Sequence, residues 1–217
     1  MSATSKIVLP RLYAIVDVDC FRSAGDVAAA VAQHTRELIA GGASLIQYRN
    51  KSGRGREMLA HAREMKRAVV AAERNGIRLI MNDRADICLA GGFDGLHVGQ
   101  DDLPPVVVRP ILGPDRLLGF STHNPEQVRE ADSMRVDYVA VGPVFTTASK
   151  AHPDPVIGVE GVKRARLMTK KPLVAIGGVT LANCREVIDA GADSVAVIAA
   201  LLPDPRQTAS EFLKLLS

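Results

Sequence analysis

The feature that most constrains the fold is a repeated local pattern, in which a helix-like segment ends in glycine and a short apolar run follows. Clear copies occur at Ala40–Ile46, Asn75–Ile80, Ala90–Leu96 and Ala190–Val197. Glycine is favoured just past a helix because the left-handed backbone found there costs it little. The apolar runs do not alternate with polar residues, which is typical of parallel strands buried on both faces. The chain is therefore expected to alternate helices with buried parallel strands.

Counting such apolar runs predicts eight strands, the number that closes a (β/α)8 TIM barrel of the α/β class. The predicted strands are Leu12–Val16, Leu45–Tyr48, Leu79–Met81, Gly95–Val98, Leu117–Phe120, Tyr138–Val141, Leu173–Ile176 and Val195–Ile198. A core-facing helical stripe follows the second strand at Met58, Ala62, Met65 and Val69. A doubly wound open sheet is the alternative, but it needs a glycine-rich turn after the first strand, and Ala14–Asp19 has none. The barrel is therefore preferred.

Composition fits one soluble domain spanning residues 1–217 and excludes several function classes. The net charge is only +3, from 27 Lys and Arg against 24 Asp and Glu, which argues against nucleic acid or membrane surfaces as partners. Aromatic residues make up 4% of the chain, too few for a base-stacking platform. The three cysteines Cys20, Cys88 and Cys184 lie far apart and are expected to be small buried apolar groups rather than disulfide partners or metal ligands. No signal segment or membrane span is found, so the cytoplasm is the expected location.

Polar residues gather where the predicted strands end, which is the end of a barrel that carries chemistry. These segments are Gln47–Lys51, Asn82–Arg84, His97–Asp102, Ser121–His123, Gly142–Lys150, Gly177–Gly178 and Ile198–Ala200. His97 lies within a strand and is expected to be a packed histidine, whereas His123 at a strand end is a candidate for acid–base work. Chance would not readily place polar groups after seven strands.

One phosphate site is expected after the last two strands. Gly177-Gly178 lets backbone N–H groups approach a ligand, and a helix starting after an N-cap at Thr180 would add its positive end. The hydroxyls of Thr147 and Ser149 could reach the same monoester. The alternative is a plain glycine turn between strand and helix.

A second, metal-bound phosphate site is expected around Asp83 and Asp102, which follow adjacent strands. Mg²⁺ usually takes one or two protein carboxylates and completes its shell with water and ligand phosphates. The nearby cations of Arg49, Lys51 and Lys150 would complement a diphosphate better than a monoester. The alternative is a surface pair of Asp83 with Arg84 and an acidic helix start at Asp101-Asp102.

The strand-end motifs together resemble the thiamine-phosphate synthase family, nearly from end to end. The segments that carry the resemblance are Gln47–Lys51, Asn82–Arg84, His97–Pro104, Gly119–His123, Val141–Phe145 with Lys150, and Ala175–Gly178. Members of this family join a hydroxymethylpyrimidine diphosphate to a hydroxyethylthiazole phosphate and release pyrophosphate. The family mechanism is dissociative: pyrophosphate leaves before the thiazole nitrogen attacks the pyrimidine-methyl cation.

The resemblance also implies roles for individual residues. The expected pyrimidine diphosphate site comprises Gln47, Tyr48, Arg49, Asn50, Lys51, Asn82, Ser121 and Lys150, with Arg49, Lys51, Ser121 and Lys150 as the catalytic group. The expected thiazole phosphate site comprises Thr147, Ser149, Gly178, Ile198 and Ala199. Mg²⁺ is the implied cofactor, on Asp83 and Asp102.

The chain departs from the family pattern at three positions, which bear on the thiazole phosphate and the pocket rather than on the reaction. Thr147-Ala148-Ser149 replaces a Thr-x-Thr, Ala199 replaces a common serine, and Tyr48 replaces a usual leucine that would leave more room. Two rivals stay open: a paralogous thiazole tautomerase, which needs a base rather than the carboxylates and cations, and a non-catalytic barrel that binds thiamine phosphates. A homo-oligomer also stays open.

Overall fold

The computed structural model describes residues 7–147 and 154–217. Eight parallel strands pair in sequence order, and β8 closes on β1, so the sheet is a barrel with no free edge. The strands are β1 (Leu12–Asp17), β2 (Leu45–Arg49), β3 (Arg78–Asn82), β4 (Gly95–Val98), β5 (Leu117–Thr122), β6 (Tyr138–Val141), β7 (Leu173–Ile176) and β8 (Ser194–Val197). The predicted (β/α)8 barrel is confirmed, and each strand lies within two residues of its predicted limits.

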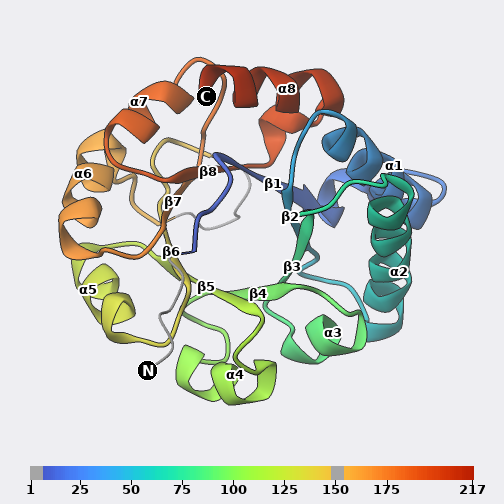
Figure 1. Cartoon of the computed structure of the whole chain (residues 1–217), viewed down its shortest axis with the longest axis horizontal. Helices are drawn as coiled ribbons and strands as arrows, with labels where there is room; N and C mark the ends of the chain where they lie inside the picture. The colour runs from blue at the N-terminus through green and yellow to red at the C-terminus, as the bar shows by residue number, and fades with distance from the viewer. Residues whose placement is uncertain (1–6, 148–153) are drawn as a thin grey trace.

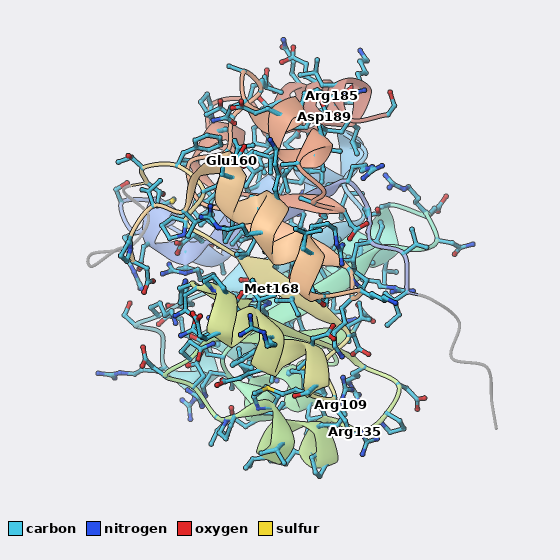
Figure 2. All side chains as sticks on the ribbon, turned by 90° about the vertical axis from the view of Figure 1, so that its left-hand side faces the viewer. Arg109, Arg135, Glu160, Met168, Arg185 and Asp189 are labelled. Carbon is cyan, nitrogen blue, oxygen red and sulfur yellow. The ribbon has the colours of Figure 1, made fainter. Side chains whose placement is uncertain are left out.

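A layer of helices surrounds this barrel, as the view down the barrel shows (Figure 1). The α-helices are α1 (Val27–Ala40), α2 (Gly55–Ala71), α3 (Ala85–Ala90), α4 (Pro105–Leu112), α5 (Pro125–Ser133), α6 (Gly158–Met168), α7 (Cys184–Asp189) and α8 (Pro205–Leu215). Two short 3-10 helices, η1 (Val18–Phe21) and η2 (Ala199–Leu201), follow β1 and β8. Figure 2 shows the helix layer from the side, with Glu160 and Met168 near the two ends of α6.

The apolar residues form two layers because side chains of a strand alternate between its two faces. One layer fills the barrel itself and includes Tyr13, Ile15, Ile80 and Tyr138. The larger layer lies between the strands and the helices and contains Cys88 and Cys184. The prediction that Cys20 is also buried is wrong, because Cys20 lies exposed on η1. In α2, the predicted stripe contributes to this outer layer through the buried Met58, Ala62 and Met65, with Val69 partly buried. The strand ends are thus fixed from both sides.

The glycines of the repeated pattern do what the pattern predicts. Gly42, Gly92 and Gly191 have φ of +102°, +64° and +108° just past α1, α3 and α7. A left-handed backbone of this kind is strained for residues with a Cβ. The turn from helix to strand therefore depends on glycine.

The helix after β7 begins later than predicted. The N-cap position is Asn183 rather than Thr180, and α7 starts at Cys184. The Asn183 side chain accepts from the Thr180 backbone N–H at 2.7 Å and donates to the Gly178 carbonyl at 3.1 Å. These contacts close residues 180–183 into a turn, so no helix start faces Gly177-Gly178 directly. Among the described residues, we find no helix with the length and apolarity to cross a membrane.

Candidate active site

The carboxyl ends of β2, β3 and β5 bring most of the expected pyrimidine diphosphate residues to one mouth of the barrel. Gln47 and Arg49 lie on β2, Asn82 ends β3, and Ser121 lies one residue before the end of β5. Gln47 pairs with Ile15 and Ile80 in the sheet register, and both isoleucines belong to the barrel core. The Gln47 side chain therefore also lies on the inner face of the barrel. Their common placement follows from the alternation of side chains along parallel strands.

Asp83 and Asp102 come together at this mouth, as the metal-site prediction requires. Burial and a hydrogen bond to Asp102 raise the pKa of Asp83 to about 6, although the Lys51 ammonium acts in the opposite direction. Lys51 Nζ lies 2.5 Å from Asp83 Oδ2. Two carboxyl groups in such contact repel once both are ionised, and a cation between them removes that repulsion.

The backbone holds both carboxylates in place. Asp83 has a φ of +63°, uncommon for a residue with a side chain, and its N–H donates to the His97 carbonyl at 2.8 Å. Asp102 Oδ2 accepts from the Gly99 N–H at 2.7 Å. Strained backbone of this kind persists where surrounding structure holds it, and it is concentrated at functional sites. Asp83 is therefore more than a surface partner of Arg84, which instead pairs with Asp86.

Arg49 has a partner that the sequence analysis did not single out. Its guanidinium forms an ion pair with Asp17, the last residue of β1 and the register partner of Arg49. Burial raises the pKa of Asp17, with the Arg49 charge opposing that shift. The signal for Asp17 was an acidic residue ending a buried strand, at the same mouth as the other polar groups.

Asn82 carries an unused donor. The side chain is 8% exposed, and its Nδ2 has no hydrogen-bond partner among the described residues. An unpaired buried polar group costs about 1–3 kcal/mol, so such groups usually await a ligand or water. The Asn82 amide thus favours an acceptor atom of a ligand at this mouth.

Tyr48 and Asn50 lie elsewhere than the resemblance implies. Tyr48 points into the outer layer, where its hydroxyl lies 2.8 Å from His61 Nδ1. Asn50 Nδ2 donates to that same hydroxyl at 3.0 Å, and Asn50 Oδ1 accepts from Arg22 at 3.0 Å. In this structure, therefore, both side chains organise the loop after β2 rather than line the barrel mouth.

The loops after β6 and β7 pack directly on one another, and these loops carry Thr147 and Gly178 of the expected thiazole phosphate site. The Phe145 N–H donates to the Gly177 carbonyl at 2.9 Å. Gly178 has a φ of +66°, and a Cβ there would lie 2.5 Å from the Thr146 carbonyl oxygen. Thr147, the residue after Thr146, is half-buried, and Ala199 is exposed at the start of η2. Ser149 and Lys150 lie outside the described residues.

The two histidines of interest face different groups. His123 Nδ1 lies 2.7 Å from the Gly142 carbonyl oxygen and 3.4 Å from Asp154, so its ring is turned toward the β6 loop. His97 lies inside the barrel, as predicted, with Nε2 2.8 Å from Ser121 Oγ and Nδ1 3.1 Å from the Tyr138 hydroxyl. Burial lowers the pKa of His97 to about 4, so the ring is neutral at physiological pH.

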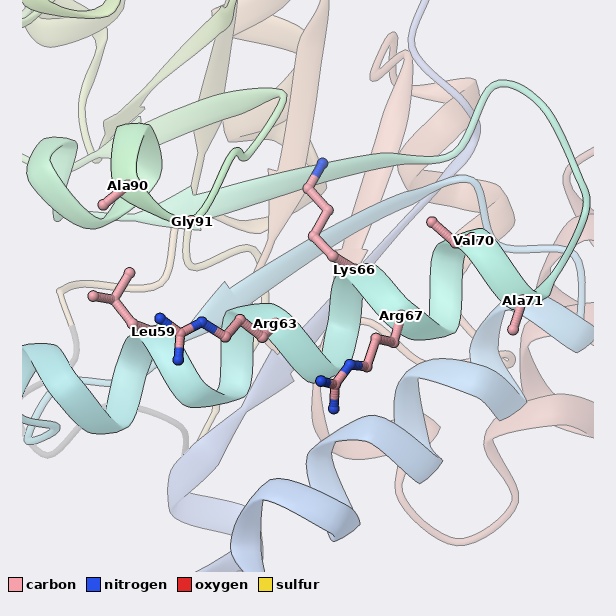
Figure 3. Close-up of a pocket in the computed structure, with 8 residues that line it drawn as sticks. All are labelled: Leu59, Arg63, Lys66, Arg67, Val70, Ala71, Ala90 and Gly91. Carbon is pink, nitrogen blue, oxygen red and sulfur yellow. The ribbon is translucent and has the colours of Figure 1, made fainter.

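A cavity of about 480 Å³ lies apart from these residues, on the outer side of α2 (Figure 3). Its lining includes Arg63, Lys66 and Arg67. Lys66 lies 3.6 Å from Asp94, and Arg67 pairs with Glu64. This surface is the solvated face of a helix on which two of the three cations are paired locally, so the candidate active site stays at the strand ends.

Comparison with known proteins identifies the family. A family profile described as thiamine monophosphate synthase matches residues 12–201. The chain belongs to the thiamine-phosphate synthase family. It is 57% identical over 212 residues to a thiamine-phosphate synthase of Koribacter versatilis, which is 98% of each chain. The thiamine-phosphate synthase of Chlorobium phaeovibrioides is 41% identical over 82% of this chain and 85% of its own.

A solved structure agrees with this assignment. Thiamine phosphate pyrophosphorylase from Pyrococcus furiosus superposes with a TM-score of 0.81, at 32% identity and 95% coverage of both chains. The chain is accordingly an enzyme of this family, a transferase of thiamine biosynthesis.

Proposed function

We propose that residues 1–217 form one catalytic domain that joins 4-amino-2-methyl-5-(diphosphomethyl)pyrimidine to 4-methyl-5-(2-phosphoethyl)thiazole, giving thiamine phosphate and pyrophosphate. The observation that carries the proposal is the cluster of Asp83, Asp102 and Lys51 at one mouth of the barrel, beside the unpaired Asn82 amide. Opposed carboxylates next to a lysine are suited to a diphosphate with its metal ion. A lone phosphate monoester would not need them.

Asp83 and Asp102 are the residues that would hold Mg²⁺. Oxygen ligands of this type suit the ion, and their mutual repulsion is what a divalent charge would relieve. The described residues contain no cluster of three or more metal-binding side chains, which fits an ion that takes its other ligands from water and substrate. When bound, Mg²⁺ would neutralise the negative charge that develops on departing pyrophosphate.

The protein's cations would act on the same charge. With the metal in place, Lys51 would exchange its contact with Asp83 for a diphosphate oxygen. Arg49, held by Asp17, would present its remaining guanidinium donors. Lys150 is proposed as a third cation. This arrangement supports a dissociative reaction, in which departure of the leaving group is assisted and no strong base is required.

The thiazole phosphate would bind where the loops after β6, β7 and β8 meet. Gly178 lets the Thr146 carbonyl approach closely, which brings the loop after β6 to the end of β7. Thr147 and Ser149 would contribute hydroxyls. At Ile198-Ala199 only backbone N–H groups are offered, because Ala199 has no hydroxyl. The thiazole nitrogen would then face the pyrimidine at the barrel mouth.

Product formation tests this proposal against its rivals. With both substrates and Mg²⁺, chromatography and mass spectrometry are expected to find thiamine phosphate formed over many turnovers. Conversion of the thiazole phosphate alone into an isomer would instead support the tautomerase. Calorimetry completes the test: tight binding of thiamine phosphate without any turnover would support the non-catalytic barrel.

A further inference from the structure

Five polar side chains form a continuous hydrogen-bonded chain across the barrel interior, and only its two ends, Gln47 and Ser121, belong to the expected pyrimidine diphosphate site. Gln47 Nε2 lies 2.9 Å from the Tyr13 hydroxyl, which lies 2.9 Å from the Tyr138 hydroxyl. Tyr138 reaches His97 Nδ1 at 3.1 Å, and His97 Nε2 reaches Ser121 Oγ at 2.8 Å. The chain thus connects residues of β2, β1, β6, β4 and β5, and we refer to it as the interior chain.

Burial makes the links that join Gln47, Tyr13, Tyr138 and His97 costly to break. Tyr13 and Tyr138 are 1% and 0% exposed, and Gln47 and His97 are 3% and 7% exposed. Buried polar groups that lose a partner are destabilising, so fully paired networks of this kind fix one arrangement of side chains.

Gly119 makes the central part of the interior chain possible. It pairs with both His97 and Tyr138 in the sheet register, so a side chain there would project between them. A Cβ at Gly119 would lie 2.0 Å from Tyr138 Cζ. Without it, the Tyr138 and His97 rings stack at a centroid distance of 5.5 Å and an interplanar angle of 26°.

The chemistry of the donors fixes a direction along the interior chain. The Gln47 amide nitrogen has only protons to give, so the Tyr13 oxygen accepts. Among the described residues, the Tyr138 oxygen is the acceptor that Tyr13 reaches for its own proton, and Tyr138 in turn donates to His97 Nδ1. A neutral imidazole that accepts at Nδ1 carries its proton on Nε2. His97 therefore donates to Ser121 Oγ, which leaves the Ser121 proton directed elsewhere.

We propose that Tyr13, Tyr138 and His97 are positioning residues that hold the Ser121 hydroxyl as a hydrogen-bond donor toward an acceptor atom of the pyrimidine diphosphate. This inference rests on the proposed function in that Ser121 contacts that substrate. Gln47 and Ser121 lie at the two ends of the interior chain, so the orientation of one contact is tied to that of the other. The substrate then meets a hydroxyl whose donor role is set in advance.

The first test reads the direction itself and needs no activity. In the full chain labelled with ¹⁵N-histidine, without substrate or metal, NMR identifies the protonated ring nitrogen of His97. The His97→Gln variant assigns the signal. We expect a proton on Nε2 and none on Nδ1 at pH 7. A proton on Nδ1 would reverse the links of His97 to Tyr138 and Ser121 and overturn the proposal.

The second test asks whether the interior chain acts through Ser121. Tyr138→Phe keeps the ring and removes the hydroxyl. It is expected to reduce kcat/KM for the pyrimidine diphosphate about tenfold, the effect of one hydrogen bond, and to leave KM for the thiazole phosphate unchanged. In a Ser121→Ala background the same change is expected to have less than about a twofold effect. Equal losses in both backgrounds would contradict the proposal, as would no loss in either.

Two further variants keep this test interpretable. Tyr13→Phe removes a hydroxyl one link further away and is expected to lower the same constant in the same direction by less. Thr122→Val is the matched control, because Thr122 adjoins Ser121 but donates to the Ala140 carbonyl outside the interior chain. It is expected to leave both constants within about twofold of the wild type. A loss as large as that of Tyr138→Phe would mean that any buried hydroxyl here has the same effect, which would overturn the proposal.

The tests distinguish the two levels of inference. If the wild-type protein forms no thiamine phosphate, the proposed function fails, and the ¹⁵N result still decides the direction of the interior chain. If turnover is normal and the double-mutant effects are additive, the proposed function stands and the positioning role fails.

Discussion

At the scale of single residues, the candidate active site is organised around charges that are placed close together and left partly unsatisfied. Asp83 has a raised pKa beside Asp102, and Asn82 keeps an amide N–H unpaired. Such arrangements lower stability in the free protein and are relieved when a ligand supplies the missing charge or acceptor.

Asp102→Ala is expected to lower Mg²⁺-dependent turnover by at least about a hundredfold, because one of only two carboxylates for the ion is lost. The fold is expected to stay intact, as judged by circular dichroism and the thermal midpoint. Asp101→Ala, at the exposed neighbouring acid, is the matched control and is expected to behave like the wild type. Full activity of Asp102→Ala at saturating Mg²⁺ would show that the metal site lies elsewhere.

Lys150→Ala is expected to cost at least about 2 kcal/mol of transition-state stabilisation, which is about a thirtyfold loss in kcat/KM for the pyrimidine diphosphate. A charge-assisted contact to the leaving group strengthens as pyrophosphate departs, so the loss is expected mainly in kcat. Lys163→Ala removes a lysine that pairs with Glu160 on α6 and serves as the comparison. An unchanged kcat/KM in Lys150→Ala would remove this residue from the catalytic group.

At the scale of secondary-structure elements, three aspartates at the amino-terminal face bind neighbouring strands to one another. Asp94, Asp137 and Asp193 each precede an even-numbered strand and accept the first or second backbone N–H of the preceding odd-numbered strand. Each also faces a cation from the helix layer, at Lys66, Arg109 and Arg166 respectively. These contacts lie opposite the candidate active site and are expected to support stability rather than catalysis.

Asp137→Ala is expected to reduce the free energy of unfolding by about 2–4 kcal/mol, because Arg109 would be left buried without its carboxylate. Figure 2 shows Arg109 close to Arg135, whose carbonyl accepts from Arg109 Nε at 3.0 Å. Urea unfolding at pH 7 measures the change, with the exposed Asp115→Ala expected within about 0.5 kcal/mol of the wild type. Equal stability of both variants would contradict this role.

His34 on helix α1 makes the stability of the folded protein depend on pH. Burial lowers the pKa of His34 to about 4, and its Nε2 has no partner among the described residues. The unfolded chain binds this proton near pH 6.5 and the folded protein only near pH 4, so stability falls as the pH drops through that interval. His34→Leu is expected to lose about 2 kcal/mol less stability than the wild type between pH 7 and pH 5. Urea unfolding at the two pH values measures this difference. An equal loss of unfolding free energy in the wild type and in His34→Leu would contradict the prediction.

Sequence patterns predicted the elements well because the determinants of the barrel are local. Unbroken apolar runs and glycines past helix ends identify buried parallel strands without tertiary information. The predicted N-cap of α7 at Thr180 was wrong. The Asn183 side chain closes residues 180–183 into a turn, and helix propensity alone would place this turn inside the helix. Asp17, Tyr13 and Tyr138 were not recognised as polar partners, because their roles depend on which strands become neighbours across the barrel.

At the scale of the whole molecule, the barrel separates stability from chemistry. The amino-terminal face holds the paired aspartates, and the carboxyl-terminal mouth gathers the carboxylates, cations and amide proposed to handle a diphosphate. The interior chain runs between strands on opposite sides of the barrel and makes the mouth dependent on the packing beneath it. We propose that metal and cations at this mouth together assist departure of pyrophosphate.

The most direct test is pyrophosphate release, measured with both substrates, with each one omitted, and with and without Mg²⁺. We predict sustained release only when both substrates and Mg²⁺ are present, with one thiamine phosphate formed for each pyrophosphate. Sustained release at the same rate without Mg²⁺ would show that the metal does not assist departure of pyrophosphate, and no release from the complete mixture would show that the protein does not catalyse this reaction.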